Sequence, residues 1–377
     1  MDDLYIGLMS GTSIDGIDAA LIDLSNHQFK LVANLYQPYP DAVKTSLSNI
    51  IQNKQFSAAD YASLDSELAM LNANAVNTLI KNSKCDSNKI KAIGYHGQTI
   101  FHEPEGKNPN SIQLGDPNVL AANTDITVVA DFRRMDMAVG GQGAPLAPGF
   151  HQFLFQETSQ TKSQHSAILN VGGIANLTIL PAESQQPITG FDTGPGNCLL
   201  DEWIQQENNQ PFDKNGDWAR QGKLNEDVLT VLLNDPYFLK CPPKSTGREY
   251  FNLAWISERC KQKNIDTASL SAQDIQTTLA SLSAITIARA VAEHAPQTQQ
   301  VYVCGGGAHN QFLLELLQAQ LGDVSLATTS ELGLDPDWVE ACAFGWLAQQ
   351  RINNNPANVP SVTGASKPVV LGVVYQN

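Results

Sequence analysis

Two segments of the chain combine apolar runs with a short turn that contains glycine. The first is LYIGLMSGTSIDGIDAALIDL, at residues 4–24, and the second is SAILNVGGIANLTIL, at residues 166–180. In each segment, apolar residues flank Gly together with Ser, Thr or Asn, a pattern that predicts two strands joined by a turn. Because each segment opens one half of the chain, the repetition predicts two related domains that face one cleft.

The remaining apolar positions predict helices that alternate with strands. Apolar residues recur at helical spacing over residues 41–53, 58–82, 272–294 and 335–350. Strand patterns lie between these helices, in KIKAIGYHGQTI, ITVVADF, ITGFDTGPGN and VYVCGGG. The alternation predicts an α/β protein with a mixed sheet in each half.

The segment DFRRMDMAVGGQGAPLAP is rich in glycine and proline and predicts a hinge between the two halves. We therefore place the boundary within residues 133–148. The expected N-terminal domain is residues 1–133, joined by the C-terminal segment 352–377. The expected C-terminal domain is residues 134–351.

Composition narrows the class of protein. The formal net charge is −15, from 38 acidic and 23 basic residues, and a field of this sign repels nucleic acid and anionic membranes. We find no apolar run as long as a bilayer span and no basic leader, so we expect a cytoplasmic protein. Six cysteines show no C-x-x-C or zinc spacing, which indicates reduced structural thiols.

Three glycine turns are candidates for a nucleotide site. The first spans residues 11–18, the second is Gly172-Gly173, and the third is Gly305-Gly306-Gly307. Glycine lets backbone amides approach a phosphate closely, and hydroxyls and amides in such turns suit its oxygens. Alone, the first turn reads more simply as a hairpin with local side-chain caps, and no Walker A motif is present. Three such turns in a duplicated α/β chain favour a nucleotide-binding cleft.

Two carboxylates are candidates for catalysis. Asp192 follows a short apolar strand and precedes Gly194-Pro195-Gly196, a position suited to a general base. The alternative is a helix-capping role, which Asn197 fills about as well. Glu340 stands among apolar neighbours on the last long helix, so it lies either on the solvent face or at a site.

His96, Gln98 and Arg133 are candidates for substrate binding. His96 and His102 do not match a zinc helix motif, so hydrogen bonding to a substrate is the favoured role for His96. The guanidinium of Arg133 matches a carboxylate, and the alternative is a surface arginine at a domain edge.

Nine motifs in order resemble the anhydro-N-acetylmuramic acid kinase family, from Ile6 to the C-terminus: MSGTSIDGIDAALID, GYHGQTIFHEP, SIQLGDPNVLA, DFRRMDMAVGGQGAPLAP, NVGGIANLT, GFDTGPGN, CGGGAHN, DWVEACAFGWLA and VTGASKPVVLGVVYQN. The resemblance implies a two-domain actin and sugar-kinase-like fold, with duplicated ribonuclease H-like mixed sheets around a central ATP cleft. It implies that ATP is bound by Gly11, Thr12, Ser13, Ile14, Asp15, Gly16, Ile17, Asp18, Gly172, Gly173, Gly305, Gly306 and Gly307. Asp192 matches the catalytic base, and Glu340 a carboxylate near the reacting sugar.

The activity implied by this resemblance is a phosphotransfer to an alcohol group, with ATP and Mg²⁺. Water opens the 1,6-anhydro ring, O6 takes the γ-phosphoryl group, and the products are N-acetylmuramic acid 6-phosphate and ADP, in peptidoglycan recycling. Relatives in the superfamily carry an aspartate where this chain has Met9, so the metal ligands stay unassigned. We expect a homodimer that acts on a small sugar. Another sugar or acetate kinase, an ATP-dependent clamp and a glycosidase are the alternatives, and an ADP-release assay separates them.

Overall fold

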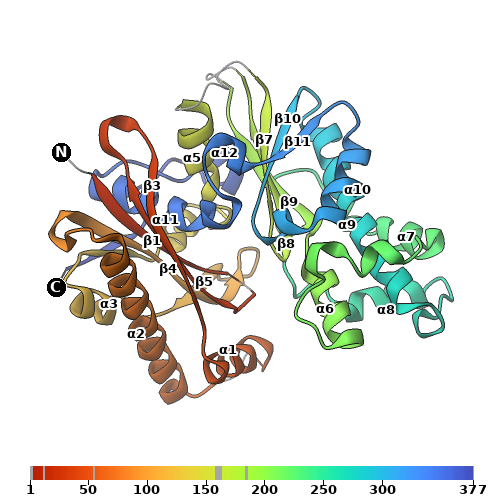
Figure 1. Ribbon diagram of the computed structural model, residues 1–377, viewed down its shortest axis with the longest axis horizontal. Helices are drawn as coiled ribbons and strands as arrows, with labels where there is room; N and C mark the ends of the chain where they lie inside the picture. The colour runs from red at the N-terminus through yellow and green to blue at the C-terminus, as the bar shows by residue number, and fades with distance from the viewer. Residues whose placement is uncertain (1–2, 12, 54–55, 158–163, 183–185, 377) are drawn as a thin grey trace. The chain divides into compact units, whose positions relative to one another are not determined.

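The structure is a computed structural model that describes residues 3–11, 13–53, 56–157, 164–182 and 186–376 (Figure 1). The chain forms two compact units, one of residues 1–159 and 338–377 and the other of residues 160–337. These units differ from the expected domains in residues 134–159 and 338–351. We expected both segments in the C-terminal domain, and both belong to the first unit.

The first unit contains a mixed sheet in the order β12-β6-β4-β1-β2-β3, with β5 paired to β4. Strands β1, β2 and β3 are antiparallel neighbours, whereas β4 runs parallel to β1 and β6 parallel to β4. The strands are β1 (Leu4–Ser10), β2 (Gly16–Asp23), β3 (Lys30–Pro38), β4 (Ile90–Glu103), β5 (Asn110–Leu114), β6 (Val128–Ala130) and β12 (Val373–Tyr375).

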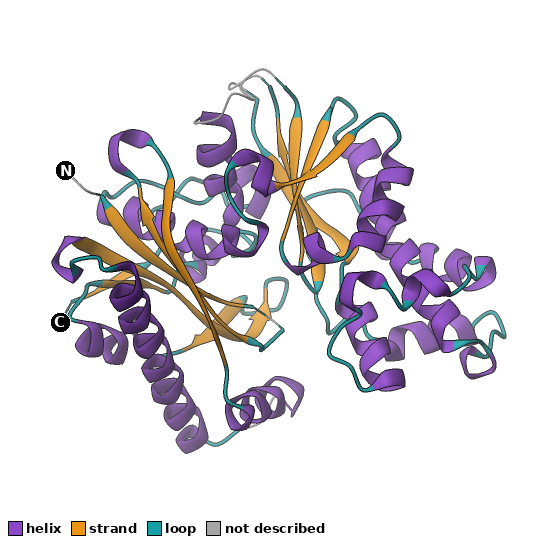
Figure 2. Cartoon of the chain, viewed as in Figure 1, coloured by secondary structure: helices purple, strands orange, loops and turns teal. Residues whose placement is uncertain are grey.

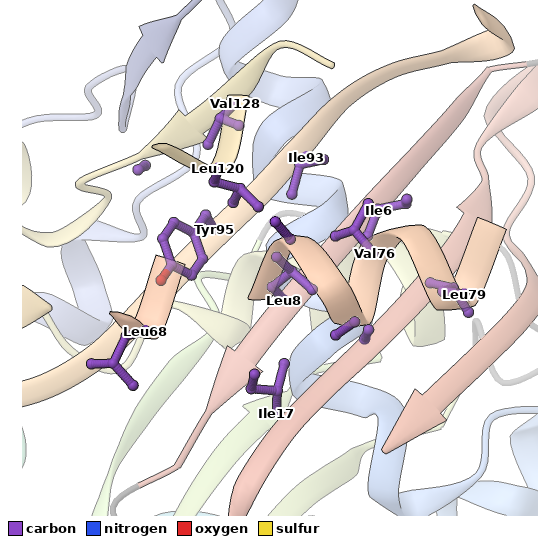
Figure 3. Packing of buried hydrophobic residues seen from close by; sticks show 14 of the residues in the cluster. Ile6, Leu8, Ile17, Leu68, Val76, Leu79, Ile93, Tyr95, Leu120 and Val128 are labelled. Carbon is purple, nitrogen blue, oxygen red and sulfur yellow. The ribbon is translucent and has the colours of Figure 1, made fainter. Parts of the chain in front are cut away.

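Helix α2 covers one face of this sheet. It begins at the N-cap Ser57, which forms a capping box with Asp60, and it ends at Lys84 in the left-handed conformation. Its buried side chains join Ile6, Leu8 and other sheet residues in one apolar cluster (Figure 3). The helices of this unit are α1 (Asp41–Asn53), α2 (Ala58–Ser83), α3 (Pro117–Thr124), α4 (Arg133–Ala138), α5 (Ala147–His151), α11 (Val339–Ile352) and α12 (Pro360–Thr363).

Helix α11 lies against the opposite face of the same strands. Side chains alternate along a strand, so Gly7 faces away from the cluster that contains Ile6 and Leu8. A Cβ at Gly7 would overlap the carbonyl oxygen of Ala341, and a Cβ at Gly94 would overlap that of Phe344. These two glycines allow α11 to pack directly on β1 and β4, which explains why residues 338–351 belong to the first unit.

The second unit repeats the strand order of the first. Its sheet runs β11-β10-β7-β8-β9, with β7, β8 and β9 antiparallel and with β10 and β11 parallel to β7 (Figure 2). The strands are β7 (Ser166–Val171), β8 (Ile174–Leu180), β9 (Thr189–Pro195), β10 (Gln300–Cys304) and β11 (Ser325–Thr328). This order matches β6-β4-β1-β2-β3 of the first sheet, strand for strand, so the predicted duplication of a ribonuclease H-like mixed sheet is confirmed.

Helix α9 is the central helix of the second unit. Among the described residues it alone is long and apolar enough to span a bilayer, which corrects our expectation that no such run exists. Of its most apolar window, 83% is buried inside the protein, as for a core helix. The helices of this unit are α6 (Cys198–Asn208), α7 (Glu226–Leu233), α8 (Leu253–Lys261), α9 (Ala272–His294) and α10 (Gln311–Leu321).

Candidate active site

The first glycine turn joins β1 to β2 and is closed by local hydrogen bonds. The Asp15 carboxylate accepts from the Ser13 hydroxyl at 2.7 Å and from the Gly16 amide at 2.9 Å. Among the described residues, a Cβ at Gly11 would meet only Ser13, with the hydroxyl at 3.5 Å and the amide nitrogen at 3.9 Å, whereas one at Gly16 would lie 2.5 Å from the Gln37 carbonyl oxygen. Gly16 therefore serves the packing of β3, and the space beside Gly11 is open. The predicted contact residue Thr12 lies outside the described residues.

Three further residues of the predicted ATP-binding segment 11–18 differ in backbone conformation and burial. Ile14 has a φ of 58°, and Ile17 is fully buried in the core, so Ile17 offers a ligand only its backbone. Asp18 lies on β2 opposite Met9 and is partly exposed.

Gln98 connects strand β4 to this turn. Its side-chain amide nitrogen donates to the Gly11 carbonyl oxygen at 3.0 Å, although the two residues are far apart in sequence. Gln98 is 1% exposed, and its Oε1 has no hydrogen-bond partner within the described part of the chain. A buried acceptor without a partner is uncommon in proteins and marks a position at which a ligand donor would be accommodated.

His96 and Arg133 form a hydrogen-bonded pair in the first unit. The guanidinium Nε and Nη2 lie 3.2 Å and 2.8 Å from His96 Nε2, and Nη1 donates to the Gly143 carbonyl oxygen at 2.8 Å. Because Arg133 is always a donor, Nε2 must be the acceptor, and the ring proton is on Nδ1. Burial and the positive charge of Arg133 hold the pKa of His96 well below its ordinary value, so His96 is neutral.

Asp136 positions Arg133 through the loop that follows it. Asp136 is fully buried, and its carboxylate accepts 2.8 Å hydrogen bonds from the Gly143 amide, the Asn358 side chain and the Thr363 hydroxyl. The Gly143 carbonyl oxygen in turn accepts from Arg133. No local pattern singles out Asp136, because two of its three partners, Asn358 and Thr363, lie more than 200 residues away in the sequence.

Glu340 lies in the first turn of α11 and is partly exposed. Burial lowers the pKa of Arg133 to about 10, while the negative charges of Glu340 and Asp136 act in the opposite direction. Glu340 is therefore within electrostatic range of Arg133, and the first unit brings together His96, Arg133 and Glu340.

Asp192 lies in the second unit, within β9 and next to a β-bulge, rather than after the strand as expected. Its Oδ2 accepts from the Thr246 amide at 3.0 Å, and its own amide donates to the Lys244 carbonyl oxygen at 3.1 Å. Burial raises the pKa of Asp192 to about 7, against the opposing effect of the Thr246 amide. Asn197, not Asp192, is the N-cap residue of α6.

The second glycine turn holds the start of α6. The carbonyl oxygens of Gly172 and Gly173 accept hydrogen bonds of 2.9–3.0 Å from the amides of residues 196–198. Of the atoms that the structure describes, a Cβ at Gly172 would meet only the Ile174 carbonyl oxygen, at 3.6 Å, but one at Gly173 would lie 2.8 Å from Nε of Arg248. Gly173 therefore leaves room for an arginine side chain, and Gly172 faces open space.

The third glycine turn follows β10. Gly305 has a φ of 76°, and a Cβ there would overlap the Asn170 side chain, while one at Gly307 would overlap Val171. A Cβ at Gly306 would meet no atom within 4 Å in the described part of the chain. We expected the strand to lead directly into a helix, but a 3-10 turn (Gly306–His309) intervenes and α10 begins only at Gln311. The terminus of α10 is therefore displaced from the glycines.

The segment from Lys244 to Arg248 lies beside Asp192 and was not predicted from the sequence. Lys244 is only 7% exposed, with its Nζ 5.0 Å from the centre of the Tyr237 ring, and burial lowers its pKa. The sequence signal was the dense polar run KSTGRE after two prolines. The part of the chain that the structure describes contains no group of three His, Cys, Asp or Glu side chains arranged to hold a metal ion.

Two mixed sheets of one topology, each with a glycine turn between its first two strands, define an α/β protein of the actin and sugar-kinase class. Within that class, the sequence model described as "Anhydro-N-acetylmuramic acid kinase" matches residues 3–377. The chain belongs to the anhydro-N-acetylmuramic acid kinase family, as the motifs predicted.

Curated relatives agree along the whole chain. The anhydro-N-acetylmuramic acid kinase of Vibrio cholerae is 46% identical over 374 residues, with 99% of this chain and 98% of the relative covered. The protein of the same name from Coxiella burnetii is 45% identical over 371 residues, with 98% and 97% covered. Among solved structures, a ROK family glucokinase from Streptomyces griseus, in complex with glucose and AMPPNP, is similar with a TM-score of 0.41 and 11% identity, covering 92% of this chain and 99% of the other.

Proposed function

We propose that this protein is an ATP-dependent kinase that opens the 1,6-anhydro ring of 1,6-anhydro-N-acetylmuramic acid and phosphorylates O6. The products are N-acetylmuramic acid 6-phosphate and ADP, and the reaction belongs to peptidoglycan recycling. Family membership over residues 3–377 supports the activity. The observation that supports the mechanism is the carboxylate of Asp192, which one backbone amide holds in place and whose pKa is about 7.

Asp192 is the proposed general base. The Thr246 amide fixes Oδ2, so Oδ1 is the atom that takes a proton from water. The water oxygen bonds to C1 as the C1–O6 bond breaks, and O6 then bonds to the γ-phosphorus as the bond to ADP breaks. The leaving oxygen of one reaction is thus the nucleophile of the other, so one geometry serves both. A base whose pKa is near neutrality combines adequate basicity with a large ionised fraction.

Arg133 is the proposed ligand of the lactyl carboxylate. A guanidinium has five N–H donors, and the contacts to His96 and Gly143 use three of them. One N–H remains on each terminal nitrogen, which suits a two-point contact with a carboxylate. His96 and the buried Oε1 of Gln98 are the proposed partners of other polar groups of the sugar, and Glu340 lies near the reacting part of it.

Each of the three glycine turns is a proposed contact for ATP. Gly11, Gly172 and Gly306 have open space where a side chain would stand, so phosphates or the base can contact their backbone there. Mg²⁺ enters as the MgATP complex. Phosphate oxygens and water supply most of its ligands, as is usual for this ion.

The cytoplasm is the proposed location. All six cysteines are in the reduced form, and four of them are buried, which agrees with a reducing compartment.

Substrate choice tests this proposal. Wild-type protein should release ADP with 1,6-anhydro-N-acetylmuramic acid and not with glucose. In Arg133→Ala, KM for this substrate should rise about 10- to 100-fold, the usual value of a charged two-point contact. KM for 1,6-anhydro-N-acetylglucosamine, which has no lactyl group, should change much less.

The neighbouring Arg134 provides the matched control. It is exposed and pairs with Asp131, so Arg134→Ala should leave both KM values unchanged. If Arg133→Ala raises KM equally for both sugars, Arg133 is a structural residue. Rapid ADP release with glucose in the wild type would contradict the proposed substrate.

A further inference from the structure

The segment that holds Asp192 also carries an arginine, Arg248, whose backbone is fixed at several points. The Thr246 amide binds the Asp192 carboxylate, and the Lys244 carbonyl oxygen binds its amide. On the other side, the Arg248 carbonyl oxygen accepts from the Asn252 side chain at 3.3 Å, and Phe251 is fully buried. Arg248 is thus placed relative to the proposed base by a short, well-anchored stretch of chain.

The side chain of Arg248 lies against the second glycine turn. Its Nε and Nη2 are 2.8 Å and 3.0 Å from the position that a Cβ on Gly173 would take. Any other residue at position 173 would have to displace the guanidinium. The absence of a side chain at Gly173 therefore has a specific structural consequence: it admits a positive charge to the turn between β7 and β8.

Arg248 also has an unsatisfied donor. Its Nε–H is buried and has no hydrogen-bond partner within the residues that the structure describes. Leaving a charged donor buried and unpaired is unfavourable, so natural proteins rarely do so unless a ligand completes the site. The geometry therefore indicates a ligand acceptor at this position.

The nearby carboxylates do not take up this donor. Asp201 and Glu202, in the first turns of α6, are within electrostatic range of Arg248. Burial nevertheless raises the pKa of Asp201 to about 7, so Arg248 compensates its charge only in part. The guanidinium of Arg248 lies against Gly173, so Asp201 and Glu202 balance its positive charge only in part.

We infer that Arg248 binds the γ-phosphoryl oxygens of ATP at the Gly172–Gly173 turn. A planar guanidinium with a free Nε–H matches a phosphate at two points. The γ-phosphoryl group is favoured over the other phosphates because Asp192 acts at C1, and O6, bonded to C1 through the bridge, must reach the γ-phosphorus. This inference rests on the proposed function, both for ATP at the glycine turns and for the path from C1 to the γ-phosphorus.

Nucleotide binding to the purified full chain tests the inference. Calorimetry should show that Arg248→Met weakens the affinity for AMPPNP about 10- to 100-fold, and the affinity for ADP less than about 3-fold. Arg248→Lys keeps the positive charge beside Asp201 and Glu202, so it should fold normally and still lose most of the preference for AMPPNP. Added guanidinium ion should partly restore turnover in Arg248→Met.

Arg220→Met is the matched control, because Arg220 pairs with Glu315 on the surface of the same unit and should leave both affinities unchanged. If folded Arg248→Lys binds AMPPNP and ADP in the wild-type ratio, Arg248 is structural and the inference fails. If instead the Arg248 variants lose the preference for AMPPNP as expected but the wild type shows no turnover of the anhydro-sugar, the inference stands and the proposed function fails.

Discussion

Asp192→Asn should lower kcat by at least about 10²–10⁴-fold, the usual contribution of general base catalysis. The substitution keeps the shape of the side chain, and the amide oxygen still accepts from Thr246, so the variant should fold and bind AMPPNP. The loss should be at the upper end if water attack and phosphoryl transfer are concerted, because neither half-reaction then proceeds alone. Initial rates of ADP release at saturating substrate measure the effect.

The pH dependence of kcat identifies the base. Asp192 has a raised pKa, about 7, and only the ionised form accepts a proton. Wild-type kcat should therefore increase as pH rises through about 7 and decrease below it, and this limb should be absent from Asp192→Asn. Asp323→Asn changes an exposed loop carboxylate and should behave as the wild type. Near-normal turnover in Asp192→Asn would make another group the base, with Glu340 as the next candidate.

Gly306→Val should reduce ATP affinity by more than about 100-fold without loss of fold, and Gly11→Val should act in the same way. A Cβ at Gly306 meets no atom of the described residues within 4 Å, so valine enters the space proposed for the nucleotide. Titration with ATP measures the affinity, and a thermal melt measures the fold.

Two control substitutions separate a ligand effect from a folding effect. Gly307→Val would overlap Val171 and should lower Tm, unlike Gly306→Val. Ala319→Val, on the exposed face of α10, should leave both Tm and ATP affinity unchanged. Wild-type ATP affinity in both Gly306→Val and Gly11→Val would remove these turns from the nucleotide site.

The local pattern of the sequence was sufficient to predict the duplicated architecture. Each strand–turn–strand unit is a contiguous run, and helix α1 has the predicted bounds, because apolar periodicity and turn residues act over a few positions. The boundary between the two units could not be predicted from local sequence patterns. It depends on α11 packing against Gly7 and Gly94, a contact between segments hundreds of residues apart.

Some of the site residues could be predicted from local motifs, and others could not. Asp192, Arg133 and the glycine turns stand in short motifs that can be read locally. Asp136 is defined by its contacts with the Gly143 amide and with the C-terminal segment. Arg248 is defined by its position against Gly173. A buried carboxylate or an unsatisfied guanidinium donor is a property of the folded chain, so no local pattern indicates it.

The fate of the water oxygen tests the central claim most directly. The wild-type reaction should be run in ¹⁸O-labelled water and quenched early, with unlabelled N-acetylmuramic acid 6-phosphate as the control for spontaneous exchange at C1. If water attacks C1 and O6 takes the phosphoryl group, the label appears in the C1 hydroxyl above the exchange control, and none appears in the phosphate. Label in the phosphate would mean that water attacks phosphorus, and it would contradict the account.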